Sequence, residues 1–287
     1  MKAKDFYKFV APSLIAMGTL LVFPLVMATW LGLNFMTYRN INNPVFVGLA
    51  NYIEVLTDQR FWQAFRFTVL FIAITVPATI VIGFLLALFL DQISGHVRGV
   101  FITLYLLPMV IVPVVGTMMF RLLFVPSGIA AWLYQEILKQ PFFFNEVSVK
   151  ILIFLNAIWT TTPFPFIVMY AGLQTLPQEQ IEAALMDGAN RRQQVRYIVI
   201  PHLSSLLVFV GLILIMDAYR VFDSIFVLTQ QNPIYKAASV MSYIFRIAMA
   251  VQQLGLANAM AILTVIMIMI VLIPLLVYTY HEQIEER

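Results

Sequence analysis

The polar residues with the most specific spacing in this chain lie in one short segment between two long apolar runs. Small residues such as its alanines allow another backbone to approach closely, and the neighbouring charges supply polar contacts. We therefore expect the segment to contact a partner protein. The alternative is a solvated loop that only connects two apolar runs. The characteristic positions are Glu182, Ala183, Ala184, Asp187, Gly188, Ile198 and Pro201.

A second group of charged residues interrupts one of the apolar runs. Asp217 and Asp223 each lie three residues from Arg220, so on a helix either acid can reach the arginine. Charges inside a membrane normally face a partner or a water-filled cavity. The group is therefore either part of a solute path or a self-neutralised structural cluster. Further candidates for a solute path are Asn156, Trp159, Tyr170 and Tyr219.

The sequence excludes several kinds of chemistry. It has no cysteine, so it holds no disulfide, thiolate nucleophile or cysteine metal site. His96, His202 and His281 lie far apart, which argues against a shared metal site. No Gly-Lys dipeptide is present, which excludes a phosphate-binding loop of the Walker A type. We expect no catalytic residue, no metal and no cofactor.

The composition is typical of an integral membrane protein. Hydrophobic residues make up 62% of the 287 residues and charged residues only 11%, with a mean hydropathy of +0.91. A soluble domain has about 25% charged residues. The net charge of +3 is small and spread along the chain, so it gives no reason to expect nucleic acid as a partner.

Six apolar runs reach or approach the length of about 20 residues that a helix needs to cross a bilayer. The runs are continuous rather than alternating, which excludes membrane-spanning strands. The expected fold class is therefore all-α, a polytopic membrane protein with six transmembrane helices. These helices are expected at residues 10–34, 67–90, 100–121, 151–173, 203–228 and 257–280.

The positive charges next to these runs give a weak indication of orientation. Both of the main clusters favour the cytoplasm, because lysine and arginine are enriched there. The N- and C-termini are then both cytoplasmic, as an even number of spans requires. The first run is uncharged over residues 9–38, which is too long for a signal peptide, so we expect a retained span. The two clusters are Lys2, Lys4 and Lys8, and Arg191, Arg192 and Arg196.

Prolines recur within the expected spans, and two of them mark the fourth. Pro163 and Pro165 each remove a backbone donor and disturb a helix. The hydroxyls of Thr160, Thr161 and Thr162 are placed to bond carbonyls that become free nearby. We expect this helix either to break near its middle or to carry an ordinary kink.

Local signals predict two short helices in the polar segment. Thr175 and Gln178 fit a capping box at the start of the first helix, and Gly188 is placed to end it. The second helix begins at about Asn190, and Pro201 then opens the fifth span.

The polar segment resembles the conserved cytoplasmic loop of permease subunits of ATP-binding-cassette (ABC) importers. The shared pattern is Glu-Ala-Ala, a glycine and, after nine further residues, Ile-x-aliphatic-Pro. The form Glu-Ala-Ala-x-x-Asp-Gly-Ala is similar to that of the carbohydrate-uptake branch, the maltose/glycerol-phosphate type. Residues 46–52, 171–177, 221–229 and 254–259 also resemble this branch. Gln-Gln-Asn-Pro at residues 230–233 departs from its usual Gly-Gly-Pro, which bears on the solute rather than on the family.

The resemblance implies a fold and a set of partners. The fold would be that of a type I ABC importer permease, with an N-terminal span and external segment at 1–65, a transmembrane domain at 66–280 and a cytoplasmic tail at 281–287. Residues 175–202 would form its cytoplasmic coupling loop. The partners would be a second homologous permease subunit, a cytoplasmic ATPase dimer, an external or periplasmic solute-binding protein, and membrane lipid.

The resemblance also implies a function. The chain would be a permease subunit in the bacterial inner membrane and not itself an enzyme. It would move a carbohydrate or polyol solute by alternating access, driven by ATP that a separate chain hydrolyses. The missing phosphate-binding loop agrees with this division of labour. Sugars, polyols and glycerol phosphates share the branch.

Two other functions are open from the sequence alone. A secondary transporter or channel subunit would work without ATP, and it usually shows more intramembrane acids or repeat symmetry than this chain has. A membrane-embedded enzyme would need convergent acid, base or metal-binding groups, which scattered histidines do not provide.

Overall fold

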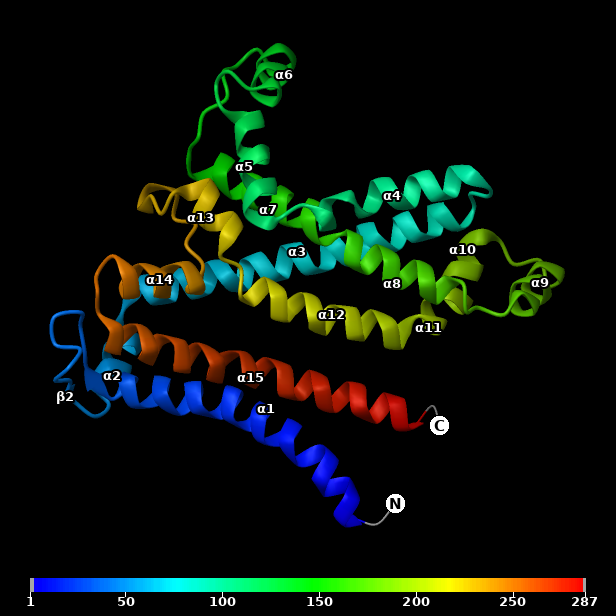
Figure 1. Cartoon of the computed structure of the whole chain (residues 1–287). Helices are drawn as coiled ribbons and strands as arrows, with labels where there is room; N and C mark the ends of the chain where they lie inside the picture. The colour runs from blue at the N-terminus through cyan, green and yellow to red at the C-terminus, as the bar shows by residue number, and fades with distance from the viewer. Residues whose placement is uncertain (1–2, 286–287) are drawn as a thin grey trace. The chain divides into compact units, whose positions relative to one another are not determined.

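The computed structural model describes residues 3–285, and most of them are helical (Figure 1). Lys2 of the N-terminal cluster and residues 286–287 of the expected tail lie outside the described residues. The chain divides into two compact units, residues 1–63 with 243–270 and residues 64–242 with 271–287. In chain order the elements are α1 Ala3–Gly32, β1 Asn34–Phe35, β2 Val45–Phe46, α2 Ala50–Thr57, α3 Gln59–Asp91, α4 His96–Val110, α5 Pro113–Phe124, α6 Ile129–Leu138, α7 Glu146–Thr161, α8 Pro163–Leu173, α9 Gln178–Met186, α10 Arg191–Gln194, a π-helix Val195–Val199, α11 Ile200–His202, α12 Ser204–Tyr219, α13 Asp223–Thr229, a 3-10 helix Pro233–Tyr235, α14 Val240–Met249 and α15 Leu254–Glu285.

Five stretches of the described chain are long and apolar enough to cross a membrane, and a bent pair of helices would make a sixth. The first, second and sixth expected spans are present as α1, α3 and α15. The five stretches are Phe9–Gly32, Gln59–Asp91, Pro113–Leu138, Glu146–Leu173 and Leu254–Pro274, and the bent pair is Arg191–His202 with Ser204–Tyr219.

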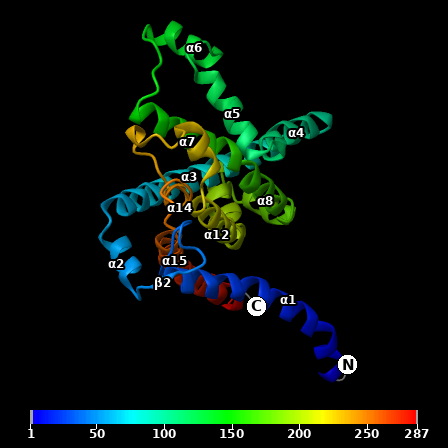
Figure 2. The same cartoon turned by 60° about the vertical axis from the view of Figure 1, so that its left-hand side comes forward.

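The third expected helix, over residues 100–121, is not continuous. α4 ends at Val110 and α5 begins at Pro113, and the two residues between them are extended, with ψ of 130° and 127°. The cause is Pro113, because the residue before a proline avoids the helical conformation. After this break α5 and α6 lead away from α4 in both views (Figures 1 and 2).

The fourth helix is kinked rather than broken. α7 and α8 are separated only by Thr162, whose N–H donates to the carbonyl of Ile158 and whose carbonyl accepts from the N–H of Phe166. The expected role of the threonine hydroxyls was wrong. They bond the carbonyls of residues 156–158, whereas the two prolines free the carbonyls of residues 159 and 161.

The fifth expected helix, over residues 203–228, ends early. α12 stops at Tyr219, and α13 begins at Asp223 after a turn in which the N–H of Arg220 donates to the carbonyl of Asp217. Asp223 therefore does not share a helix face with Arg220. The expected pairing of either acid with the arginine holds only for Asp217.

The core of the larger unit forms where α3, α8 and α12 pack together. Phe166 and Met169 of α8 are fully buried in one cluster with Leu90 of α3 and Leu214 of α12. Gly83 permits the close approach of α3, because a Cβ there would lie 2.9 Å from the backbone nitrogen of Phe166. A second buried cluster joins α3, α7 and α13.

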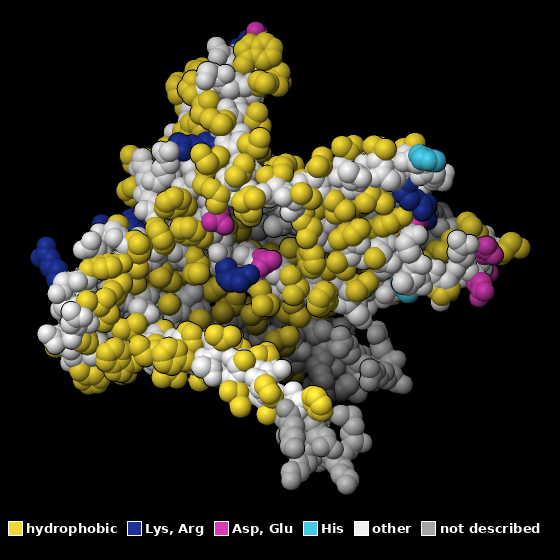
Figure 3. Space-filling model, viewed as in Figure 1, with side chains coloured by type: hydrophobic (Ala, Val, Ile, Leu, Met, Phe, Trp, Pro, Cys, Tyr) yellow, Lys and Arg dark blue, Asp and Glu magenta, His cyan; other side chains and the backbone are white. Residues whose placement is uncertain are grey.

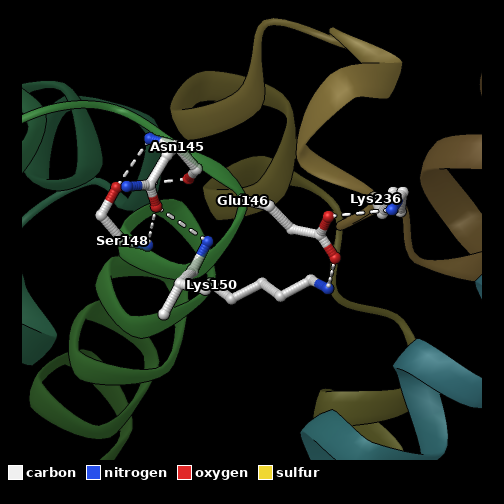
Figure 4. Close-up of polar contacts among 6 residues, drawn as sticks. Asn145, Glu146, Ser148, Lys150 and Lys236 are labelled. Carbon is white, nitrogen blue, oxygen red and sulfur yellow. Dashed lines mark hydrogen bonds and ion pairs between the residues drawn. The ribbon is translucent and has the colours of Figure 1, made fainter.

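Polar contacts fix the start of α7 in the same unit (Figure 4). Asn145 caps the helix, because its Oδ1 accepts from N–H groups of the first turn and its own N–H donates to Ser148 Oγ. Glu146 accepts from Lys150 Nζ at 2.8 Å and from Lys236 Nζ at 3.0 Å. Since Lys236 follows the 3-10 helix, these ion pairs connect α7 to the chain after α13.

In the smaller unit, the antiparallel pair β1–β2 and helix α2 hold the end of α1. Asn51 Nδ2 of α2 donates to the carbonyls of Gly32 and Asn34 at 2.9 and 3.0 Å. Gly255 at the start of α15 leaves room for the Asn34 carbonyl, which would lie 2.0 Å from a Cβ. This short ribbon is the only β-sheet in the described chain, so the helical class is confirmed.

A buried tyrosine joins α14 to the start of α3 in the same unit. The hydroxyl of Tyr243 donates to Asp58 Oδ2, and the guanidinium carbon of Arg246 lies 4.9 Å from the centre of its ring. Burial, and secondarily the bond to Asp58, raise the pKa of Tyr243 to about 12. The phenol therefore stays protonated and able to donate.

We expect Tyr243→Phe to lower the free energy of unfolding by about 1.5–3 kcal/mol, because the fold loses a hydrogen bond to a carboxylate. The contribution should be complete below pH 10, the ordinary tyrosine pKa, and should disappear as the pH rises through about 12, because a raised pKa in the folded state favours the protonated phenol. Thermal unfolding in detergent measures both effects.

Tyr38→Phe is the matched control. Among the described residues, the hydrogen-bond partner of the Tyr38 hydroxyl is the sulfur of Met249, at 3.5 Å, so its loss should change the melting temperature far less. Equal losses in the two variants would contradict a stabilising role for the Tyr243–Asp58 bond.

Candidate functional site

The polar segment of the sequence forms a chain of short helices in the larger unit, and α9 is its most exposed part (Figure 1). No side chain of α9 is buried in the described structure, and only Ile181 and Ala184 are half-buried. Met186 is 89% exposed and Leu185 is 57% exposed. Acidic side chains gather over the same helix (Figure 3). α9 therefore presents a mixed acidic and apolar surface that no other part of the described chain covers.

Gly188 ends α9 in a Schellman motif. Its N–H donates to the carbonyl of Leu185 at 3.0 Å, and the N–H of Ala189 donates to the carbonyl of Ala184 at 2.8 Å. This geometry requires a left-handed residue, and Gly188 has φ of +79°. The space around it is open, so the backbone conformation and not packing calls for glycine. The expected helix end is confirmed.

The start of α9 differs from the expectation. Pro177 is the N-cap, and the helix begins at Gln178. The predicted capping box with Thr175 was wrong, because the Thr175 hydroxyl donates instead to the carbonyl of Gly172 at 2.7 Å and lies 3.0 Å from His202 Nε2. Thr175 thus belongs to the end of α8 and to the returning chain.

The returning chain is helical but irregular. α10 begins after Asn190, as predicted, and Asn190 caps it through a capping box with Gln193. The π-helix follows and contains the half-buried Ile198. Pro201 lies in α11, before a bend of 67° that leads into α12, so it does not open the span as expected. Prolines and π-turns are both known causes of sharp helix kinks.

A half-open cavity of about 100 Å³ lies within the larger unit, between α3, α7 and α12. Its volume is sufficient for several water molecules. Apolar side chains such as Phe71, Val76 and Leu214 line part of its wall. The polar residues that line the rest are Thr75, Thr79, Thr160, Thr161, Asp217 and Ser224.

The threonines present hydrogen-bond acceptors to this cavity. Each donates its single hydroxyl hydrogen to a carbonyl one turn earlier in its own helix, for example Thr75 to Phe71 at 2.6 Å and Thr161 to Ala157 at 2.6 Å. A hydroxyl has one hydrogen and two lone pairs, so each oxygen can still accept. With the Asp217 carboxylate, the cavity favours molecules that donate hydrogen bonds.

The structure brings only Asp217 of the predicted solute-path residues into this cavity. Asn156 is buried, with its Oδ1 accepting from Thr117 Oγ1 of α5 at 3.2 Å. Trp159 of α7 stacks on Phe120, which also belongs to α5. Tyr170 stacks on Phe166 in the core.

The remaining candidates lie around the turn after α12. Tyr219 is buried. Arg220 bonds Asp217 at 2.6 Å, and both side chains are more than half exposed. Asp223 is exposed and forms no ion pair in the part of the chain that the structure describes. Arg220 bonds Oδ1 of Asp217, so Oδ2 is left to accept hydrogen bonds in the cavity that Asp217 lines.

The sequence did not indicate Thr75 and Thr79 as site residues, and it indicated Thr160 and Thr161 only for bonding backbone carbonyls. Thr75 and Thr79 lie one helical turn apart, and Thr160 and Thr161 lie on a different helix. The one-turn spacing of Thr75 and Thr79 within an apolar span was a usable signal, because such residues face the same direction. The meeting of the two helices was not visible in the sequence.

Comparison with known proteins gives one family and one type of structure. Residues 6–284 match the family described as "Binding-protein-dependent transport system inner membrane component". The trehalose/maltose transport system permease protein MalF of Thermococcus litoralis is 30% identical over 272 residues, covering 93% of this chain and 91% of that protein. The trehalose transport system permease protein SugA of Mycobacterium tuberculosis is 30% identical over 239 residues, covering 83% and 76%.

Solved structures show the same fold. A bacterial ABC transporter involved in the import of the acidic polysaccharide alginate matches with a TM-score of 0.84 at 19% identity, covering 96% of this chain and 95% of that chain. The alginate transporter in complex with its alginate pentasaccharide-bound periplasmic protein matches with a TM-score of 0.81 at 20% identity, covering 96% and 92%.

Gly188→Ala should loosen the end of α9 without unfolding the protein. A non-glycine residue in the left-handed conformation costs roughly 1–2 kcal/mol, so we expect the backbone amides of residues 187–190 to exchange with solvent about tenfold faster. Hydrogen–deuterium exchange measures this.

Gly99→Ala serves as the control, because Gly99 lies inside α4 with open space around it and alanine favours a helix. Unchanged exchange at residues 187–190 in the Gly188 variant would show that the left-handed glycine does not hold the end of α9.

Proposed function

Because the chain belongs to the family of inner-membrane components of binding-protein-dependent transport systems, and its relatives include sugar permeases, we propose that it is the permease subunit of an ATP-driven importer of a sugar or polyol. It is a multi-pass inner-membrane protein. Its bent helix pair would count as one span, which gives six spans and places both termini in the cytoplasm. The boundaries at 65/66 and 280/281 between an N-terminal segment, a transmembrane domain and a tail remain part of this proposal.

The exposed helix α9 is the observation that carries the proposal. Glu182, Ala183 and Asp187 all lie on its open surface, and the uncovered Leu185 and Met186 offer apolar area to a partner. The chain contains no Walker A loop, so a separate ATPase dimer would supply the energy. α9 would dock on that ATPase and act as the coupling helix.

The remaining partners follow from the relatives. MalF and SugA are named as permease proteins of transport systems, and one solved neighbour is held in a complex with a periplasmic protein. We infer a second, homologous permease subunit and an external solute-binding protein for this chain as well. Membrane lipid would cover the exposed apolar faces of its spans.

The acceptor-rich cavity supports a polyhydroxylated solute. Sugar and polyol hydroxyls can donate to the oxygens of Thr79 and Thr161 and to the carboxylate of Asp217, which line the same space. Arg220 already pairs with the Asp217 carboxylate at 2.6 Å, and no lysine or arginine lines the described cavity wall to bind a second anion. The solute of this chain would therefore be neutral, unlike the alginate of the solved transporter.

The chain leads from α9 to the cavity wall through a few consecutive helices. α9 returns through α10, the π-helix and α11 to the 67° bend, and α12 then carries Leu214 and Asp217 into the cavity wall. Movement of α9 during ATP binding would tilt α12 and change access to the cavity. Alternating access would follow from this connection.

Glu182→Lys should abolish transport while the protein still inserts into the membrane. Reversing a charge in a desolvated interface costs about 2–5 kcal/mol, so we expect the co-purified ATPase to fall by tenfold or more. Replacing Gly188 by valine should have the same effect through the end of α9. Affinity purification from membranes and sugar uptake in cells measure both steps.

Glu54→Lys, the same charge reversal at an exposed position of α2, provides the control for ATPase retention. Normal uptake and ATPase retention in both α9 variants would rule out the coupling role.

Thr79→Val and Thr161→Val should weaken transport without changing assembly. Each removes one acceptor from the cavity, and a hydrogen bond contributes about 1 kcal/mol, so we expect about a fivefold higher half-saturating concentration of sugar. Uptake over a concentration series with trehalose and maltose measures it.

Thr103→Val tests the specificity of this effect, since Thr103 is exposed on α4 and also bonds a carbonyl of its own helix. Wild-type half-saturation in both cavity variants would remove the cavity from the solute path.

A further inference from the structure

The two ends of the polar segment are joined by one side-chain contact. Thr175 follows the end of α8, and His202 is the last residue of α11, yet Thr175 Oγ1 and His202 Nε2 lie 3.0 Å apart. Thr175 Oγ1 also donates to the carbonyl of Gly172 at 2.7 Å. Because a hydroxyl carries one hydrogen, the threonine oxygen then accepts from His202 Nε2–H. The bond therefore runs from His202 through Thr175 to the end of α8.

The bend between α11 and α12 packs directly against α8. A Cβ on Gly172 would lie 2.6 Å from Leu203 Cδ2 and 2.5 Å from Leu206 Cδ1. Leu203 is fully buried and occupies the bend between α11 and α12. The missing side chain of Gly172 thus allows the bend to rest directly on the last turn of α8.

A third contact extends the arrangement to α3. Gln174 Nε2 donates at 3.0 Å to Oδ1 of Asp91, the last residue of α3. The ends of α3, α8 and α11 are therefore tied together next to the start of α9. Most of the cavity wall comes from α3, α12 and α7, and α8 is the kinked continuation of α7.

We propose that Gly172, Thr175 and His202 form a loop-base clamp that makes α9 and α12 move together. The inference rests on the proposed coupling role of α9. The clamp contact is exposed to solvent, so it adds little to the stability of the fold. Its effect is geometric, because it closes the base of a segment of otherwise short and irregular helices. Without it, displacement of α9 would open the base of the loop and leave α12 in place. Thr175 and His202 are positioning residues.

The absence of cysteine allows a direct test by distance measurement. Spin labels are attached to Gln180→Cys on exposed α9 and to Phe209→Cys, which is 48% exposed on α12. The labelled chain is purified with its ATPase and partner subunit. The distance between labels is then measured without nucleotide and with ATP trapped by vanadate.

With the clamp intact, the label distance should be the same in both states. In His202→Ala and in Thr175→Val, addition of nucleotide should shift or split it by more than about 3 Å, within the range of helix displacements in allosteric proteins. His202→Gln should restore the wild-type behaviour, because its amide can donate to Thr175. His96→Ala, at the exposed start of α4, is the matched control.

The outcomes separate the clamp from the proposed function. A nucleotide response in both clamp variants that equals that of the unsubstituted labelled chain, with assembly intact, overturns the clamp alone. A purified chain that retains no ATPase overturns the proposed function, and the clamp with it. A nucleotide response that appears in His202→Ala and Thr175→Val but not in His202→Gln supports the clamp. A general loss of folding would not be prevented by one hydrogen-bond donor at position 202.

Discussion

No water is available in the interior of a bilayer to bond backbone N–H and C=O groups, and most of this structure follows from that constraint. It favours the long helices α1, α3 and α15 and keeps the interruptions of the other spans short. At Thr162 the helical hydrogen bonds continue through the kink despite two prolines. The threonine hydroxyls of the spans donate to carbonyls of their own helices for the same reason. Because each hydroxyl hydrogen is used within its own helix, the threonine oxygens can only accept, and the cavity wall is therefore rich in hydrogen-bond acceptors.

The polar segment is the part of the larger unit that this constraint does not govern. Its short helices need no apolar surround, so α9 can expose acidic and apolar side chains together. In the proposed coupling role it would also transmit force to helices in the membrane. The buried Leu203 and the Thr175–His202 contact give it a defined base. Under the proposed function, the 67° bend would convert a displacement of this segment into a tilt of α12. An exposed surface on a fixed base is what the proposed coupling to a separate ATPase would require.

Local signals were sufficient for a large part of the architecture. Hydropathy identified the membrane class and the positions of α1, α3 and α15, because a span must be apolar over its own length. Gly188 and Asn190 were recognised as the end and start of neighbouring helices, because capping depends on residues within one turn. The spacing of Glu182, Gly188 and Pro201 indicated the family to which the chain belongs.

The sequence by itself thus determined what each segment is, and the tertiary structure decided which segments meet. The breaks at residues 111–112 and 220–222 were missed, because apolar composition is blind to the backbone conformation before a proline or at a helix end. Thr175 was assigned to a local cap, although its partner His202 lies 27 residues away. The cavity required α3, α7 and α12 to converge, and a pairing of distant residues leaves no periodic signal in a single sequence.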